Sequence, residues 1–168
     1  KSELDALQSQ INPHFLYNTL DSIVWMVESE RYEEAISMVT ALANLFRISL
    51  SKGKTIITIA EEFQHAKSYS SIQKVRFKNK FEVNFLLDEE LEKYPIIKLV
   101  IQPLLENAMY YGMETMDGDG EILVTGYAKD GDIYIDVIDN GIGMPPEQVE
   151  KLLTGENYER KRGSGIGL

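Results

Sequence analysis

The sequence of 168 residues contains no cysteine. Disulfide bridges, thiolate nucleophiles and cysteine-based metal sites are therefore excluded, and the absence is typical of a reducing compartment. No apolar run reaches the roughly 20 residues that a membrane-spanning helix needs, and no signal peptide opens the sequence. Only two histidines are present and neither belongs to an HExxH motif, so a zinc site is not expected.

Basic residues are scarce, since 17 Lys and Arg stand against 27 Asp and Glu, which gives a formal net charge of −10. Such a chain lacks the basic surface that non-specific binding to nucleic acid or to anionic membranes requires. Residues 1–80 carry ten basic and nine acidic side chains (+1), whereas residues 81–168 carry seven and eighteen (−11). This change indicates two units with different surfaces, although two faces of one domain would also explain it.

The first half of the sequence is patterned as helices. Apolar residues recur at three- and four-residue spacing over 4–11, over 16–27, and along a face made of Ile36, Val39, Leu42, Ala43, Phe46 and Leu50. Gly53 predicts the end of the helix that precedes it. Residues 55–59 are expected to be extended, and residues 61–78 to form a further helix.

After residue 80 the pattern becomes that of a mixed α/β unit. Residues 81–87 alternate as in a strand, and residues 121–128 and 132–138 are rich in strand formers on either side of Asp130-Gly131, which predicts a hairpin turn. A helical stripe runs over 97–108, where Pro103 predicts a kink or a late start. Pro145-Pro146 predicts the start of a short helix over 147–153.

Three polar segments of the second half, taken together, are typical of a nucleotide site. They are Glu106-Asn107-Ala108 on the apolar helix, Asp139–Met144 directly after a strand, and Gly163–Leu168 after a polar tail. An Asn oxygen suits Mg²⁺, an Asp can accept from an adenine amino group, and glycines let the backbone approach a base or a phosphate. Each segment alone is more often a turn, a solvated surface or a flexible loop, but their order and placement favour the nucleotide site.

The first half contains a candidate nucleophile, His14. A neutral imidazole is a good nucleophile for phosphoryl groups. Pro13 is expected to break the helical hydrogen-bond ladder and to expose the ring, and Asn18, one turn later, is expected to orient it. A lone histidine on a helix is usually structural, and this is the interpretation given to His65.

The segment from Gln10 to Ser22 (QINPHFLYNTLDS) closely resembles the phosphoacceptor box of LytS/YesM-type sensor histidine kinases of bacterial two-component systems. The resemblance covers essentially the whole chain. It continues through Gln73–Phe77, Gln102–Ala108 (the N box), Asp139–Met144 (the G1 box) and Gly163–Leu168 (the start of the G2 box).

The resemblance implies an α+β fold with two domains. Residues 1–78 would form a helical dimerisation and phosphoacceptor domain that pairs two chains. Residues 79–168 would form a Bergerat-type (GHKL) α/β sandwich that binds ATP and lacks its last elements. Sensor and membrane segments are expected upstream, which would make the chain the cytoplasmic domain of a bacterial inner-membrane protein.

The resemblance also implies roles for single residues. His14 would be autophosphorylated by the γ-phosphate of ATP and would pass the phosphoryl group to an Asp of a response regulator. Asn107 would bind Mg²⁺ through the phosphates, Glu106 would be a polarising or general-base group, and Asp139 would hold the adenine amino group. Gly141 and Gly143 would shape the base pocket, residues 145–164 would form a lid, and Gly163, Gly165 and Gly167 would close on phosphate. Apart from the resemblance, the cluster Arg160, Lys161 and Arg162 beside the glycine run is a candidate for offsetting the negative charge of this half, and a solubilising patch on a loop is the alternative.

One departure from the family concerns the phosphate side. The family commonly has basic residues and a His after the N box, whereas Met109, Tyr110 and Tyr111 precede Gly112 here. Tyrosine carries no charge, so nucleotide affinity is expected to be weakened. Two alternatives therefore stay open: a degenerate kinase acting as a dimeric interaction scaffold, and an ATPase of the same fold gated by nucleotide, which the segment around His14 disfavours.

Overall fold

The computed structural model describes residues 12–113 and 118–141. Contacts divide the chain into two compact units, one of Lys1–Lys78 with Glu92–Leu99 and the other of Asn79–Leu91 with Val100–Leu168. The helical pattern over 4–11, the helix expected over 147–153 and the glycine segment Gly163–Leu168 lie outside the described residues. Among the helices that are described, none is long and apolar enough to cross a membrane.

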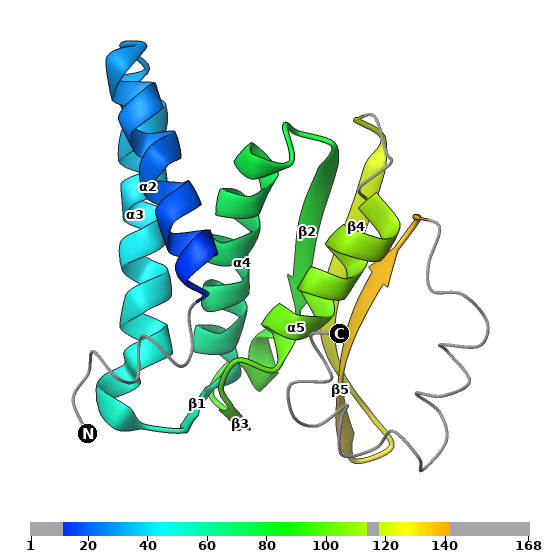
Figure 1. The fold of residues 1–168 in the computed structure, drawn as a ribbon. Helices are drawn as coiled ribbons and strands as arrows, with labels where there is room; N and C mark the ends of the chain where they lie inside the picture. The colour runs from blue at the N-terminus through cyan, green and yellow to red at the C-terminus, as the bar shows by residue number, and fades with distance from the viewer. Residues whose placement is uncertain (1–11, 114–117, 142–168) are drawn as a thin grey trace. The chain divides into compact units, whose positions relative to one another are not determined.

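The first unit contains three long helices and a two-stranded ribbon (Figure 1). The strand β1 pairs antiparallel with β3, which is about 40 residues further along the chain, and Ile57 lies opposite Ile96. The helices predicted over 16–27, over 36–50 and over 61–78, and the extended segment at 55–59, are confirmed. The elements are α2 (Pro13–Glu28), α3 (Tyr32–Leu50), the short turn η1 (Ser51–Gly53), β1 (Ile56–Thr58), α4 (Ile59–Arg76) and β3 (Pro95–Ile97).

Local sequence signals explain where these helices begin and end. Thr58 and Glu61 form a reciprocal capping box at the start of α4, in which each side chain accepts from the other residue's backbone N–H. The helix α3 ends at Leu50, three residues before the glycine that predicted its end, because Ser51 already adopts the left-handed conformation (φ 44°). Lys52 (φ 53°) and Gly53 (φ 84°) continue this left-handed turn.

The core of the first unit takes only part of the apolar face predicted for α3. Leu42 is buried, but Ile36 is 65% exposed and Val39 is 49% exposed. Their places in the core are taken by a neighbouring stripe of the same helix, Ala35, Met38, Leu45 and Ile48. The helix therefore has two apolar stripes, and packing within this unit covers one of them.

A buried polar cluster joins the end of β3 to the helices. Lys98 Nζ donates to the carbonyl oxygens of Ser49 (2.6 Å) and Leu50 (3.3 Å), which are among the last carbonyls of α3. Ser49 Oγ lies 3.0 Å from His65 Nε2. Burial, and to a smaller extent the charge of Lys98, lowers the pKa of His65 to about 4. His65 is thus a neutral core residue, as the sequence indicated.

The second unit contains a three-stranded sheet covered on one face by a helix (Figure 1). The strand order is β2-β4-β5, with β2 parallel to β4 and β4 antiparallel to β5. The hairpin turn at Asp130 (φ 53°) and Gly131 (φ 84°) is confirmed. The elements are β2 (Phe81–Leu87), η2 (Glu89–Leu91), α5 (Ile101–Asn107), a π-helical turn η3 (Ala108–Met113), β4 (Gly120–Lys129) and β5 (Asp132–Asp139).

The helix α5 starts later than its apolar stripe. It begins at Ile101, which places Pro103 in the first turn, where a missing N–H costs no helical bond. Ile97, the first residue of the predicted stripe, is wrong as a helical position, because it lies in β3. The core between helix and sheet consists of Phe81, Ile101, Leu105, Met109, Ile122 and Val124.

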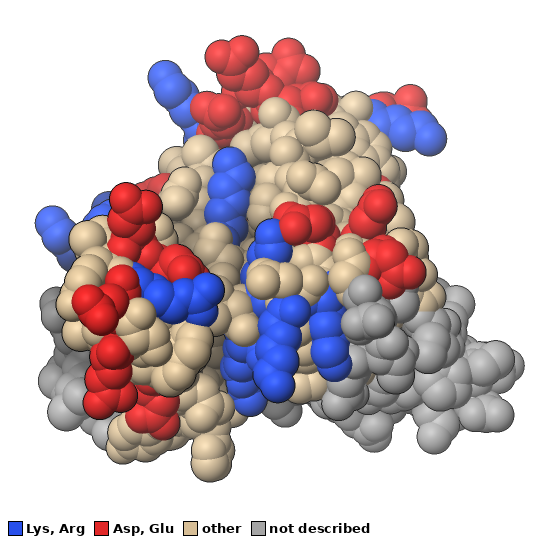
Figure 2. Space-filling model, turned by 90° about the horizontal axis from the view of Figure 1, so that it is seen from above, with Lys and Arg blue, Asp and Glu red and all other residues tan. Residues whose placement is uncertain are grey.

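Acidic and basic side chains both gather in groups on the face shown in Figure 2.

Candidate phosphoacceptor and nucleotide sites

His14 is the second residue of α2, and its side chain is exposed. Asn12 is the N-cap, and its Oδ1 accepts from the backbone N–H of His14 at 2.7 Å. Pro13 is the first helical residue, where it starts α2 and does not interrupt it. The local sequence therefore fixes the backbone beneath an exposed imidazole at the positive end of a helix.

The residue after His14 anchors the start of α2. Phe15 is buried, and its ring stacks on that of Tyr69 in α4 with centroids 5.5 Å apart. Thr19 Oγ1 donates to the carbonyl oxygen of Phe15 at 2.7 Å. Asn18 is half-buried one turn beyond His14, and within the described part of the chain no hydrogen bond joins its side chain to the imidazole. An orienting role for Asn18 stays a prediction.

Glu106 and Asn107 are the last two residues of α5, directly before the π-helical turn. Gln102 Nε2 donates to Glu106 Oε1 at 3.1 Å, one helical turn away. Burial raises the pKa of Glu106, and the hydrogen bond from Gln102 partly opposes this shift. π-Helical turns occur frequently at functional sites, because they change the direction in which side chains leave the helix.

Two glycines bring η3 against the end of β5. A Cβ added at Gly141 would lie 2.0 Å from the carbonyl oxygen of Gly112, and one added at Gly112 would lie 2.8 Å from Asp139 Oδ1. At Gly141 the nearest atoms all belong to the backbone of Gly112, so this position has no room for a side chain and the two backbone segments meet directly, whereas at Gly112 the nearest atoms belong to the side chain of Asp139. Asp139 Oδ1 also accepts from the N–H of Gly141 at 2.8 Å. The structure thus brings the turn η3, which follows the N box, against the start of the G1 box.

Asn140 stabilises this arrangement from the other side. Its Oδ1 accepts from the N–H of Glu121 at 2.8 Å, and its Nδ2 donates to the carbonyl oxygen of Asp119 at 3.2 Å. The side chain therefore ties the end of β5 to the start of β4. Sequence reasoning gave no role to Asn140, Gln102 or Gly112. Gly112 could have been found from the sequence, because a glycine at the end of an apolar helix indicates a special backbone position. Asn140 and Gln102 could not, because the fold decides which groups their side chains contact.

The residues that follow the N box do not supply a cation in the described structure. Met109 is completely buried between helix and sheet, and Tyr110 is 45% exposed. Met109 is thus a core residue and Tyr110 is uncharged, in a segment where the family commonly has basic residues and a His. Of the remaining predicted site residues, Gly143, Arg162, Gly163, Gly165 and Gly167 lie outside the described part of the chain.

Comparison with known proteins gives two matches in succession. Residues 2–81 match the family described as histidine kinase, and residues 92–168 match the histidine kinase-, DNA gyrase B- and HSP90-like ATPases. Over its whole length the chain is 39% identical to the sensor histidine kinase YesM of Bacillus subtilis. It is 32% identical to the sensor protein LytS of Bacillus cereus over 99% of its length, and 29% identical to the sensor histidine kinase BtsS of Escherichia coli over 96%.

The chain belongs to the sensor histidine kinases. The family resemblance and the α+β fold inferred from the sequence are confirmed, and the second unit has the fold of the ATP-binding GHKL proteins. The chain spans 28% of the length of each of these three sensor kinase relatives.

The described residues of the second unit fit a nucleotide in two respects. The glycine contact leaves no Cβ between the turn after the N box and the start of the G1 box. Asp139 uses Oδ1 for Gly141, and no hydrogen bond occupies its Oδ2 among the described residues, so an acceptor remains for an amino group. Within the described ranges no group of three or more His, Cys, Asp or Glu side chains could hold a metal ion.

Proposed function

We propose that this chain uses ATP to phosphorylate His14 and passes the phosphoryl group to an Asp of a response regulator. The observation that carries the proposal is the exposed imidazole at the anchored start of α2, in a chain whose second unit has the ATPase fold. Residues 1–78 would be the phosphoacceptor and dimerisation domain and residues 79–168 the ATP-binding domain, with residues 92–99 packed against the helices.

The chemistry assigned to His14 follows from its position. A ring nitrogen attacks the γ-phosphorus, the N–P bond forms, the bond to the β-γ bridging oxygen breaks, and ADP leaves. Phosphoryl transfer asks a protein mainly to position the reactants and neutralise charge. Because His14 is in the first turn of α2, the helix dipole stabilises the negative phosphoryl group that it receives. Glu106, whose pKa is raised by burial, is our candidate for the group that takes the ring proton.

The nucleotide would lie over the contact between Gly112 and Gly141. Asp139 would accept from the adenine amino group, since its Oδ2 remains available among the described residues. Asn107 would bind a Mg²⁺ ion that also takes phosphate oxygens and water, which is the usual mixture for this metal. The proposal is completed by Gly143, Gly163, Gly165 and Gly167 on family resemblance, and by Arg162 because it lies beside the glycine run.

Homodimerisation through α2 and α3 is part of the proposal. Each helix has a second apolar stripe at alternating three- and four-residue spacing, and most of its side chains are exposed. Heptad spacing of this kind is typical of helices that pack in a bundle. Two chains would cover these stripes in a four-helix bundle. The stripes are Tyr17, Leu20, Val24 and Val27 on α2, and Ile36, Val39, Ala43, Phe46 and Leu50 on α3.

A second candidate function is a kinase homologue that serves as a dimeric scaffold. The feature that favours it is the pair Tyr110-Tyr111, because these uncharged residues stand in the segment where the family commonly has basic residues and a His near phosphate. In either case the chain would lie on the cytoplasmic side of a membrane and be attached through other segments of the receptor.

The experiment is incubation with γ-labelled ATP and Mg²⁺. We expect a phosphoprotein whose label is lost in acid and stable in base, as for a phosphohistidine, and we expect no label in His14→Gln. As a control, calorimetric titration should show that His14→Gln binds ADP as the unchanged chain does. Persistent label in the variant would remove the role of His14, and the absence of Mg²⁺-dependent nucleotide binding by the unchanged chain would favour the scaffold.

A further inference from the structure

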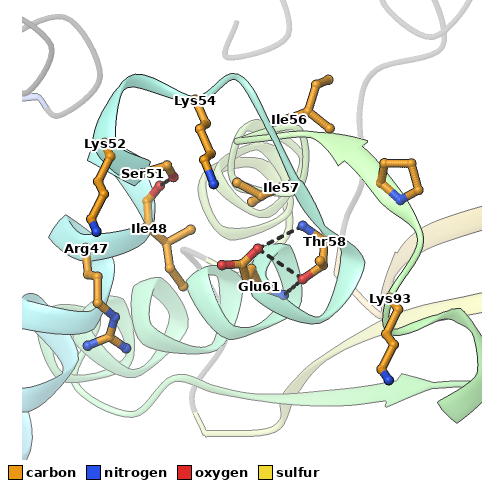
Figure 3. A pocket seen from close by; sticks show the side chains of 11 residues that line it. Arg47, Ile48, Ser51, Lys52, Lys54, Ile56, Ile57, Thr58, Glu61 and Lys93 are labelled. Atoms are coloured by element: carbon orange, nitrogen blue, oxygen red, sulfur yellow. Dashed lines mark hydrogen bonds between the residues drawn. The ribbon is translucent and has the colours of Figure 1, made fainter.

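A pocket of about 470 Å³ lies in the first unit, where the end of α3 meets the ribbon and the start of α4 (Figure 3). Neither His14 nor any other residue of the proposed phosphoacceptor site lines it. Four of its lining side chains are basic: Arg47, Lys52, Lys54 and Lys93. We call this site the basic pocket.

The charge of the basic pocket is not neutralised by the residues that the structure describes. Its single acidic residue, Glu61, is engaged with Thr58 in the capping box at 2.9 and 3.1 Å. In the described ranges none of the four basic side chains has a carboxylate partner within 4.0 Å, and Arg47 donates only to the neutral side chain of Asn44. Like charges around one cavity repel each other, so an anion bound among them is stabilised.

The basic side chains come from separate segments that the fold brings together. Arg47 is on the last turns of α3, Lys52 and Lys54 belong to the turn after it, and Lys93 precedes β3. In Figure 3, Lys54 extends toward Ile57 and Glu61, with Arg47 and Lys52 on one side and Lys93 on the other. This placement surrounds the cavity with positive charge and does not spread it along one helix face.

The turn that supplies two of these cations has an unusual backbone. Ser51 and Lys52 are non-glycine residues with positive φ (44° and 53°), directly before Gly53 at 84°. Such conformations are disfavoured for residues with a Cβ, and where a fold maintains them they cluster at ligand and switch sites. The left-handed turn is therefore an observation independent of the charge that also marks this place.

The lining of the pocket includes an apolar part. It is formed by the buried side chains of Ile48 and Ile57 and by Pro95 of β3. The volume falls in the range of roughly 300–1,000 Å³ that is usual for small-molecule sites. Cations with an apolar surface beside them are suited to a ligand that has anionic groups and an apolar part.

We propose that the basic pocket binds a small organic anion with at least two phosphate or carboxylate groups next to an apolar portion. The inference does not depend on the kinase function, since the site is contained in the first unit. A bound anion would link the end of α3, β1 and the start of β3. Because β3 leads through Lys98 to Leu99, where the chain passes into the second unit, the ligand would stabilise the segment that precedes this passage.

The test is calorimetric titration of the whole chain with inorganic pyrophosphate and, separately, with citrate, at constant ionic strength and without Mg²⁺ or nucleotide. We expect binding of one anion per chain by at least one probe. The double variant Lys52→Gln with Lys54→Gln should bind about tenfold more weakly, since it removes two of the four cations. The matched control, Arg76→Gln with Lys129→Gln, removes the same charge from two exposed positions that do not line the pocket and should bind within about twofold of the unchanged chain.

The outcomes separate the sources of the anion. Binding of pyrophosphate alone supports a phosphate-bearing ligand, citrate alone supports a carboxylate, and both support the shared chemistry. A chain that binds neither probe, or two double variants that lose affinity equally, would overturn the proposal. Lys93→Gln, from a different segment, provides a second test if the double variant does not fold, and it should weaken binding by roughly threefold.

Discussion

Replacing Gly141 with alanine should push the segment after β5 away from the turn η3, and these two segments form the proposed nucleotide site. The added Cβ would lie 2.0, 2.3 and 2.4 Å from the carbonyl oxygen, Cα and carbonyl carbon of Gly112. An ordinary contact begins at 3.4 Å, so one backbone segment has to move by 3.4 − 2.0, or about 1.4 Å. All three atoms belong to the backbone, and no flexible side chain can move away to relieve the contact.

The size of the effect follows from this displacement. Overpacking of a well-packed site costs about 1–3 kcal/mol. Movement of the segment after β5 also weakens the hydrogen bond from Gly141 to Asp139 Oδ1, which is worth about 1 kcal/mol. We expect the free energy of unfolding to fall by about 2–4 kcal/mol. In the proposed site the same movement shifts the Asp139 carboxylate, and we expect ADP to bind at least roughly tenfold more weakly.

Urea unfolding and calorimetric titration with ADP would measure both quantities. The matched control is Gly131→Ala, because no atom lies within 4 Å of the added Cβ and the only strain comes from φ of +84°. This control should lose about 1–2 kcal/mol of stability and keep its affinity for ADP. The reasoning is refuted if Gly141→Ala is no less stable than Gly131→Ala and binds ADP like the unchanged chain.

Three further predictions concern the first unit. Ile36→Glu with Val39→Glu should shift the chain from dimer to monomer in sedimentation experiments, whereas Thr40→Glu, at an exposed residue of α3 that belongs to neither apolar stripe, should not. The pKa of His65 is lowered from 6.5 to about 4 in the fold, so between these two pH values the unfolded chain binds a proton that the folded chain does not. The free energy of unfolding is therefore highest above this window and should fall on acidification, by about 2 kcal/mol from pH 7 to pH 5. His65→Gln should not show this loss of stability between pH 7 and pH 5. An equal loss in the variant would mean that His65 is not its source. Lys98→Met should lower the free energy of unfolding by about 1–2 kcal/mol through the lost carbonyl contacts and should raise the pKa of His65 in an NMR titration, because the charge of Lys98 contributes to its shift.

Much of the local structure was determined by the sequence itself. Asn12-Pro13 specifies a helix start that leaves His14 exposed, Thr58 and Glu61 specify the start of α4, and Asp130-Gly131 specifies the hairpin between β4 and β5. These signals act over a few residues, so they do not depend on the rest of the chain. The family boxes were recognisable for the same reason, since each is a short segment with its own residue order.

The tertiary structure decided the features that depend on distant partners. Ile97 lies in a strand because β1, about 40 residues away, pairs with it. α3 carries two apolar stripes, and packing against the other helices decides that Met38 is buried and Ile36 is not. The contact of Gly112 with Gly141 and the gathering of four cations around one pocket arise only when separate segments meet. Local pattern limits which residues can serve a site, but long-range packing selects the neighbours that complete it.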